Sequence, residues 1–438
     1  MRPIILFLTA CALTAAEPDW TRIDREALDL FQRYVRIASV NPPADTREAA
    51  SLLKRELEAR GIEAHTYTSG PQGQTNLVAR LAGRDRSKKP LVLMNHMDVV
   101  PVDRKAWKLD PFGALIRDGF LWGRGAFDMK PIGVQQLMAL GAMKQAGIVP
   151  ARDIVFLATA DEEVAGKYGA QWMIDNHYSE IDAGYVMDEG GFGSREVFAG
   201  GKLVFGVAVG EKQPVWLRLR ARGTAAHGSQ PIPDNANDIL LAAIEKAKAV
   251  PPPASQHPVV EEMMRAIGGQ AAGNKFTSAI RRNTVSLTTL TAGVGSPPKV
   301  NVIPSVSEAT LDCRLLPGVN AEEFISEMKA RINDPRVSVE LLSLPVDPGT
   351  SSYRTPLFAA IRSAILKQYP DAVVTPILVP YSTDSAKFRK KGVPAYGLLP
   401  VVVDLATFSS MHGDAERLPV DGFLKGVHIY FNLLRSEY

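Results

Sequence analysis

The stretch LVLMNHMDVV, residues 91–100, decides the fold of this 438-residue chain. Its apolar run is typical of a strand buried on both faces of a sheet, and it stops before Pro101. The run ends by presenting His96 and Asp98, which the two-residue period of a strand places on the same side. Asp98 can then accept a hydrogen bond from one ring nitrogen of His96 and fix its tautomer, as happens beside metal-binding histidines.

Further apolar runs alternate with helical patterns on both sides of this stretch. Strands are expected at 75–82, 90–95, 153–159, 183–187, 372–378 and 393–399, and helices at 24–39, 45–60, 132–146, 356–368 and 420–435. Continuous apolar strands separated by helices indicate a mostly parallel central sheet that is covered by helices on both faces. The sequence therefore predicts the α/β class.

The pattern changes near residue 211. VWLRLRARG, residues 215–223, alternates strictly and predicts a half-exposed strand, and a helix, two strands, a helix at 321–332 and a final strand follow. This order is typical of a small antiparallel α+β domain of the ferredoxin-like kind. We expect a catalytic domain formed by 17–210 and 346–438, and an inserted lid or dimerisation domain at 211–345. The pattern does not predict the structure of 251–283.

Composition excludes several classes of partner. The 50 basic and 47 acidic residues are mixed along the chain and leave a formal net charge of +3. No long-range field is then available to attract nucleic acid or an anionic membrane. We expect a small-molecule substrate, recognised at a local site.

The N-terminus carries a targeting pattern. Arg2 precedes the apolar run IILFLTACALTAA, which is too short to span a bilayer stably and predicts a signal peptide over residues 1–16. Cleavage after Ala16 would release the protein to the periplasm or outside the cell. The alternative is a membrane-anchored lipoprotein, because LTAC at 8–11 resembles a lipoprotein box with Cys11 as the lipidated residue. Cleavage leaves Cys313 as the remaining cysteine, so we expect no internal disulfide.

Four further loops present polar residues that can bind a metal. Three follow or lie between strands of the expected sheet and the fourth precedes the last helix; they contribute Asp128, the pairs Glu162–Glu163 and Asp188–Glu189, and His412. Open α/β sheets bind ligands at the carboxyl ends of their strands, so we expect these loops to converge with His96. Histidines and carboxylates with almost no cysteine favour zinc or a related divalent ion in a hydrolytic site.

Together the motifs HMDVVPV, GRGAFDMK, DEEVAG, MDEGG, GTAAHGS and MHGD span nearly the whole chain. In this order they resemble the co-catalytic di-zinc family of aminoacylases, vacuolar and glutamate carboxypeptidases and succinyl-diaminopimelate desuccinylase. The likeness is greatest to its vacuolar-carboxypeptidase and N-fatty-acyl-amino-acid hydrolase branch. The resemblance implies two Zn²⁺ ions, with Co²⁺ or Mn²⁺ as possible substitutes, and a cis peptide after Asp128.

The resemblance also implies roles for the metal-site residues. His96 and Glu189 would bind separate zinc ions and Asp128 would bridge both, while Glu163 and His412 would complete the two shells. From the residues alone, either Asp188 or Glu189 can reach the metal; the family pattern favours Glu189. Glu162 would be the general base, because adjacent glutamates can divide base and ligand duties between them.

Two residues of the smaller domain are candidates for substrate contact. His227 lies in a Gly-rich turn, and the resemblance implies that it reaches a partner subunit's active site in a homodimer and stabilises the oxyanion. Asn301 resembles a substrate-contacting asparagine. The alternatives are a surface-turn histidine and a β-turn asparagine. The residue that holds the substrate carboxylate is not identified.

The predicted function is a secreted di-zinc metallohydrolase that cleaves an amide bond next to a free carboxylate. It would act as a carboxypeptidase or dipeptidase, or as an N-acyl-amino-acid amidohydrolase, by metal-activated water with a glutamate base. One alternative is a biosynthetic deacylase of the desuccinylase type, which would normally work in the cytoplasm. Another is a non-catalytic binding relative, which would be expected to lack the base or a ligand.

Overall fold

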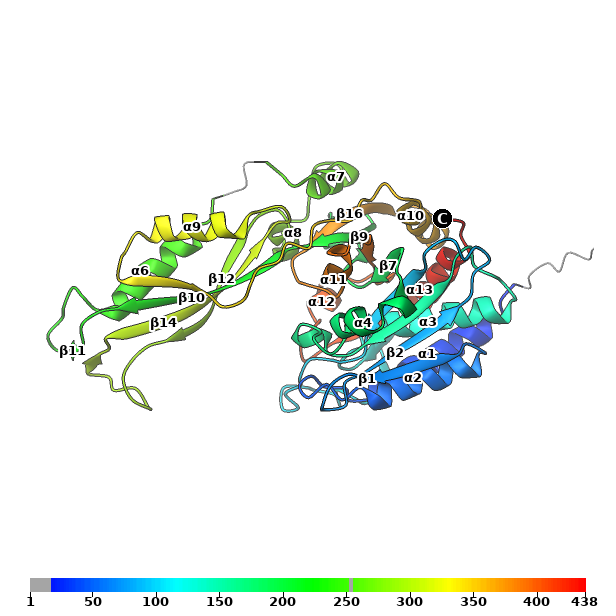
Figure 1. Ribbon diagram of the computed structural model, residues 1–438, viewed down its shortest axis with the longest axis horizontal. Coiled ribbons are helices and arrows are strands. Elements are labelled where there is room, and N and C mark those ends of the chain that lie inside the picture. The colour runs from blue at the N-terminus through cyan, green and yellow to red at the C-terminus, as the bar shows by residue number, and fades with distance from the viewer. Residues whose placement is uncertain (1–16, 252–254) are drawn as a thin grey trace, which may run out of the picture.

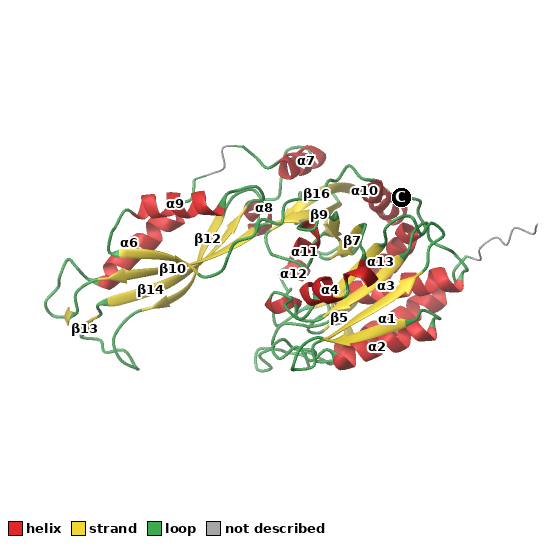
Figure 2. Ribbon diagram, in the orientation of Figure 1, coloured by secondary structure: helices red, strands yellow, loops and turns green. Residues whose placement is uncertain are grey.

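The structure is a computed structural model that describes residues 17–251 and 255–438. The expected signal peptide and Cys11 lie outside the described residues. The chain forms a large α/β domain and an elongated smaller domain beside it (Figure 1). Figure 2 shows helices on both faces of the large sheet and on one side of the smaller one. In the described ranges, every helix is too short or too polar to cross a membrane.

The large sheet is parallel through its centre. Its strands lie in the order β1 (Ala64–Thr68), β2 (Thr75–Leu81), β6 (Ile154–Thr159), β3 (Leu91–His96), β7 (Tyr185–Asp188), β17 (Ala395–Gly397), β9 (Val204–Glu211) and β16 (Val373–Val379), with β8 (Phe192–Ser194) paired to β9. Strands β6, β3, β7 and β17 run parallel, and β1, β2 and β8 add antiparallel pairs. The predicted α/β class is confirmed.

Helices cover both faces of this sheet. The first group is α1 (Trp20–Arg36), α2 (Arg47–Ala59), α3 (Lys130–Gln145), α10 (Pro356–Gln368) and α13 (Val420–Leu434); the other face carries α4 (Ala170–Asn176), α5 (Tyr178–Ile181) and α11 (Ser385–Arg389). Leu91 and Leu93 of β3 face the first group, while Val92 and Met94 face the second. Both faces of β3 are therefore buried, which is why its sequence is a continuous apolar run.

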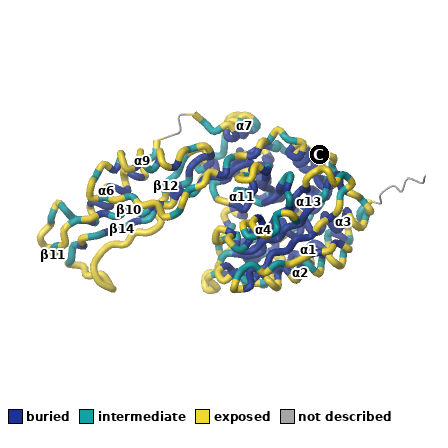
Figure 3. The backbone as a smooth tube through the Cα atoms, viewed as in Figure 1, coloured by how far each residue is buried: buried dark blue, intermediate teal, exposed yellow. Residues whose placement is uncertain are grey.

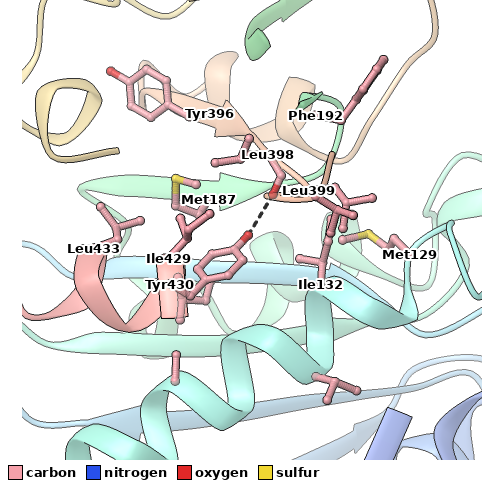
Figure 4. Close-up of a cluster of buried hydrophobic side chains, with 14 of the residues drawn as sticks. Met129, Ile132, Met187, Phe192, Tyr396, Leu398, Leu399, Ile429, Tyr430 and Leu433 are labelled. Atoms are coloured by element: carbon pink, nitrogen blue, oxygen red, sulfur yellow. Dashed lines mark hydrogen bonds between the residues drawn. The ribbon is translucent and has the colours of Figure 1, made fainter. Parts of the chain in front are cut away.

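Figure 4 shows one part of this core, where α3 and α13 meet the segment that follows β17. The Tyr430 hydroxyl donates a hydrogen bond of 3.0 Å to the carbonyl of Leu398, so this buried polar group is satisfied. Figure 3 shows that buried residues concentrate in the large domain, whereas the far end of the smaller domain is exposed.

The smaller domain is an antiparallel sheet with two helices on one face. Its strands lie in the order β12 (Thr284–Thr291), β14 (Val306–Leu315), β10 (Gln213–Arg222) and β15 (Val337–Leu341), and α6 (Ala236–Lys248) and α9 (Ala321–Ile332) pack on it. The predicted strand 215–223 corresponds to β10, which is paired with β14 and β15. At the exposed end, β11 (Ala226–His227) pairs with β13 (Val302–Ile303).

The segment 251–283 departs from the expected division of domains. It contains α7 (Pro258–Ile267) and α8 (Lys275–Ala279), and α7 lies near β16 (Figure 1). The buried side chains Val260, Met263 and Phe276 belong to the hydrophobic core of the large domain. These helices lie within the range expected for the smaller domain, but Val260, Met263 and Phe276 are buried against the large one.

One strand of the large sheet and a separate small sheet were not predicted. Strand β9 is completely buried beside β16 and β17, and a three-stranded sheet pairs β4 (Leu115–Arg117), β5 (Phe120–Trp122) and β18 (Arg417–Pro419). This small sheet joins chain segments that are almost 300 residues apart in sequence, as the register Trp122–Arg417 shows.

Candidate metal centre

Asp128 lies between two histidines that are far apart in the sequence. Its Oδ1 is 3.1 Å from Nε2 of His96, and its Oδ2 is 3.0 Å from Nε2 of His412. Each carboxylate oxygen therefore faces a different imidazole. This is the arrangement expected of a carboxylate that bridges two cations.

Each histidine has a glutamate as a second neighbour. Oε1 of Glu189 is 3.7 Å from Nε2 of His96, and Oε2 of Glu163 is 3.6 Å from Nε2 of His412. The side chains of His96 and Glu189 lie on the same side of Asp128, which favours one shared ion over the separate ions expected for them. Glu163 and His412 form the other side.

The fold explains why these side chains meet. His96 is the last residue of β3, Glu189 follows the last residue of β7, and Glu162 and Glu163 form a short turn soon after β6. These parallel neighbours in the sheet end at the same edge. His412 lies in a turn between α12 (Leu405–Phe408) and β18, with φ of +61°, a left-handed conformation uncommon for a residue with a side chain.

Asp98 contacts His96 mainly through its backbone. Nδ1 of His96 is 3.0 Å from the carbonyl oxygen of Asp98 and 3.6 Å from its Oδ1. The carboxylate accepts hydrogen bonds from Nδ2 of Asn41 at 2.7 Å and from the backbone amides of Glu162 and Glu163 at 3.2 Å each. The predicted carboxylate–imidazole contact is thus secondary, because this carboxylate also holds the turn that carries both glutamates.

Asp188 faces away from the histidines. Its Oδ2 accepts hydrogen bonds from the backbone amide and the hydroxyl of Ser385, at 3.0 and 2.8 Å. Glu189 has its carboxylate beside His96 instead. Of the two alternatives left by the sequence, the geometry favours Glu189 as the residue that faces a metal.

The electrostatics of the cluster call for cations. Burial raises the pKa of Glu162 and Glu189 well above the usual glutamate value, and neighbouring carboxylates add to the shift. Burial, followed by the charge of Asp128, raises the pKa of Glu163 to about 8. Among the described residues, Oε1 of Glu163 is buried and has no hydrogen-bond partner.

Crowded carboxylates are costly to ionise without a compensating positive charge. Ligand atoms of His96, Asp128 and Glu163 lie within 4.8 Å of one another, and so do those of His96, Glu162 and Glu189. Imidazole and carboxylate donors at this spacing suit Zn²⁺ and similar divalent ions. The residues present therefore fit a metal centre.

Asn41 is a supporting residue that was not predicted from the sequence. It is buried, and its side-chain amide also lies 3.3 Å from Oδ1 of Asp161, next to the Glu162 turn. The available signal was the NPP stretch after α1, where a polar residue precedes two prolines. That stretch predicts a turn but gives no indication that it reaches the end of β3.

His227 and Asn301 lie together, but not at the metal centre of their own chain. The amide of Gly228 donates a hydrogen bond of 2.8 Å to the carbonyl of Asn301, and Nδ1 of His227 is 2.8 Å from the hydroxyl of Ser229. Both candidates are exposed, at the end of the smaller domain remote from β3 and β7 (Figure 1). Within one chain, neither residue contacts the cluster around Asp128.

Known proteins are similar to this chain over most of its length. The profile of Peptidase family M20/M25/M40 matches residues 92–436. Aminoacylase-1 of Sus scrofa is 30% identical over 419 residues, covering 94% of this chain and 95% of that protein. A probable carboxypeptidase S-like 2 of Dictyostelium discoideum is 28% identical, covering 82% of this chain and 74% of that protein.

A solved structure has the same fold over nearly the whole chain. An M20 family metallo-carboxypeptidase from Sulfolobus solfataricus superimposes with a TM-score of 0.71 at 19% identity. The match covers 94% of this chain and 98% of that one. Both domains are thus included in the similarity.

Proposed function

Because the chain belongs to Peptidase family M20/M25/M40 and is a metal-dependent enzyme that hydrolyses amide bonds, we propose that its substrate carries a free carboxylate next to that bond. The substrate is a short peptide or an N-acyl amino acid. The names of the relatives, an aminoacylase and a carboxypeptidase, support both choices. The observation that carries the proposal is the position of Asp128 between two histidine–glutamate pairs.

Two Zn²⁺ ions are the proposed cofactors, with Co²⁺ or Mn²⁺ as substitutes. His96 and Glu189 would hold one ion, His412 and Glu163 the other, and Asp128 would bridge them. The buried Oε1 of Glu163, which has no hydrogen-bond partner within residues 17–251 and 255–438, supports this assignment. When bound, such a pair of ions polarises the scissile carbonyl and lowers the pKa of the attacking water.

Glu162 is the proposed general base. Its backbone is fixed by the hydrogen bond to Asp98, and its carboxylate lies near His96 and Glu189 without belonging to either histidine–glutamate pair. Burial raises the pKa of Glu162, which makes its carboxylate a stronger base. Glu162 can then take a proton from the attacking water and deliver it to the leaving nitrogen.

Asp98 is the proposed positioning residue of this base. Its carboxylate accepts hydrogen bonds from the backbone amides of Glu162 and Glu163, and its backbone carbonyl faces the ring of His96. It therefore fixes the base, one ligand of each side and the tautomer of His96 together.

A homodimer is proposed to complete the site. His227 is exposed and remote from Asp128 of its own chain, so a role in stabilising the oxyanion requires the partner's metal centre. Asn301, held beside His227, would contact substrate from the same side. Strand β12 is an exposed edge of the smaller sheet and offers a surface for pairing two copies.

Hydrolysis of matched substrates tests the proposal. The metal-loaded protein is assayed on dipeptides and N-acyl amino acids, each paired with an analogue whose carboxylate is blocked as an amide. The expected result is metal-dependent hydrolysis of the free acids with little activity on the blocked analogues. Equal hydrolysis of both members of each pair would contradict the requirement for a carboxylate.

Export to the periplasm or the medium is proposed from the N-terminal pattern alone. Cell fractionation of the full chain and mass measurement of the mature N-terminus test it. A chain beginning at Glu17 is expected. A lipid-modified chain beginning at Cys11 would indicate membrane anchoring, and an intact chain in the cytoplasm would contradict export.

A further inference from the structure

Two loops that carry ligands of the proposed metal centre are joined by a small sheet outside the main one. Strand β5 leads into the loop containing Asp128, and β18 follows the turn containing His412. The two strands pair directly, with Trp122 opposite Arg417. Glu416 and Arg124, which flank this pairing, are both buried.

Glu416 binds the loop of Asp128. Its Oε1 accepts hydrogen bonds from the amides of Phe127 at 2.8 Å and of Asp128 at 3.1 Å. Its backbone carbonyl accepts another, of 3.0 Å, from the amide of Gly123. A single residue thus holds both ends of the segment that presents Asp128.

Arg124 binds the turn of His412. Its Nη1 donates to Oε2 of Glu416 at 2.5 Å, and its Nη2 donates to the backbone carbonyl of His412 at 3.1 Å. Its guanidinium also lies 5.4 Å from the ring centroid of Trp107, a cation–π distance. The planar fork of arginine can make these contacts at once, whereas the ammonium group of lysine is a single point.

We propose that Arg124 and Glu416 are positioning residues that set the distance between Asp128 and His412 and thereby create the second cation site. This inference rests on the proposed function. Neither side chain is among the proposed ligands, and the pair acts through the backbone of each loop.

The effect should fall unequally on the two ions. His96 and Glu189 are fixed by the ends of β3 and β7, inside the main sheet. His412 is 47% exposed and lies in a turn, so its contact with Arg124 is a main restraint on its position. Loss of the Arg124–Glu416 pair should therefore lower the affinity for the ion between Glu163 and His412 more than the affinity for the ion between His96 and Glu189.

Metal titration of Arg124→Lys and Glu416→Gln tests the inference. Each folded, metal-stripped protein is equilibrated over a series of buffered free Zn²⁺ concentrations, and bound zinc per chain is measured by elemental analysis. Wild type is expected to bind two ions. In both variants the affinity for one of the two ions should fall about 10- to 100-fold, the range known for residues that support metal ligands. In Arg124→Lys the other ion should keep its wild-type affinity.

Glu211→Gln is the matched control. Glu211 and Arg389 form another buried ion pair, in which Glu211 accepts a hydrogen bond of 3.0 Å from the amide of Thr383. This variant should lose thermal stability to a similar extent while binding both ions as wild type does. Thermal unfolding is recorded for every variant.

Three results would overturn the inference. The first is wild-type affinity for both ions in both Arg124→Lys and Glu416→Gln. The others are an equal fall in affinity for both ions in Arg124→Lys, or the same fall in zinc affinity in Glu211→Gln. A wild-type protein that binds no zinc would instead contradict the proposed metal centre itself. The two failures are therefore distinguishable.

Discussion

Glu162 and Glu163 are adjacent, but their surroundings favour different roles for the two side chains. Glu163 faces His412 and Asp128 and carries a buried oxygen without a partner among the described residues, which suits a ligand. Glu162 lies outside both histidine–glutamate pairs and suits a base. Glu162→Gln should therefore retain both ions but lower turnover by about 10²- to 10⁴-fold, the usual contribution of general acid–base catalysis. Zinc content and turnover number are measured together.

Glu163→Gln is the matched variant at the neighbouring position. It should lose affinity for the ion beside His412, because a neutral amide is a much weaker ligand for Zn²⁺ than a carboxylate. Turnover of Glu163→Gln should recover in part at high zinc concentration. Turnover of Glu162→Gln should stay low at every zinc concentration. Recovery of Glu162→Gln by added zinc would show that the roles are reversed.

At the residue scale, the sequence predicts the identity of the clustered side chains better than their pairing. The two-residue spacing of His96 and Asp98, and the position of each candidate relative to the expected sheet, indicate that they converge. The sequence does not show which glutamate faces which histidine, because this depends on side-chain directions at the ends of different strands. It also gives no sign that Asp98 would bind the Glu162 turn.

At the scale of elements, α7 is predicted to stabilise the large domain. Met263 is fully buried in the core of that domain, and Met328 of α9 is equally buried in the core of the smaller one. Each substitution by alanine should lower the free energy of unfolding by about 2–5 kcal/mol. Leu137 of α3 also lies in the core of the large domain. Met263→Ala and Leu137→Ala should therefore lower the urea midpoint of the same unfolding transition.

Urea unfolding followed by hydrogen exchange distinguishes the two domains. Met328→Ala should accelerate exchange mainly in β10 and β14, and Met263→Ala mainly in β9 and β16. The reverse pattern would place α7 energetically with the smaller domain.

The connection between the domains contains a buried lysine whose proton should influence stability. Lys212 lies between β9 and β10, and its Nζ donates to the carbonyl of Ala279 at 3.0 Å and to the hydroxyl of Thr284 at 2.9 Å. Burial lowers its pKa to about 7; Arg314 and Arg282 reinforce the shift and Asp312 opposes it. Between pH 7 and about 10.4, the unfolded chain therefore binds a proton that the folded chain does not.

Stability should consequently rise with pH across this window. From pH 7.5 to 9.5 the free energy of unfolding of wild type should rise by about 2 kcal/mol relative to Lys212→Met, which has no titrating group. Denaturant titrations at several pH values measure this difference. The two proteins would show parallel pH profiles if Lys212 stayed protonated in the folded state.

Among the elements, long apolar or strictly alternating runs were the most predictable. Helix α13 and strands β3, β6 and β10 follow their hydrophobic patterns to within a few residues. Helices α7 and α8 lie in a segment rich in proline, glycine and polar residues, where periodicity is weak. Their position depends on packing against the core of the large domain, which no local pattern reveals.

At the scale of the whole molecule, the remote position of His227 requires assembly if it acts in catalysis. His227→Ala should lower turnover by about 10²- to 10³-fold, the usual effect of losing an oxyanion donor, and leave zinc content unchanged. Turnover should also fall on dilution as the dimer dissociates. Sedimentation and activity are measured over the same concentration range.

His65→Ala is a control for the loss of an exposed histidine, since His65 lies on β1 at the edge of the large sheet. Its activity and zinc content should match those of wild type. A fully active monomer, or an unaffected His227→Ala, would contradict the contribution from the partner.

Zinc positions in crystals provide the most direct test of the whole account. An anomalous difference map recorded at the zinc absorption edge should show two peaks on either side of Asp128. One should lie within coordination distance of His96 and Glu189, and the other of Glu163 and His412. A single peak, or peaks away from Asp128, would contradict the claim that these distant loops form a two-metal centre.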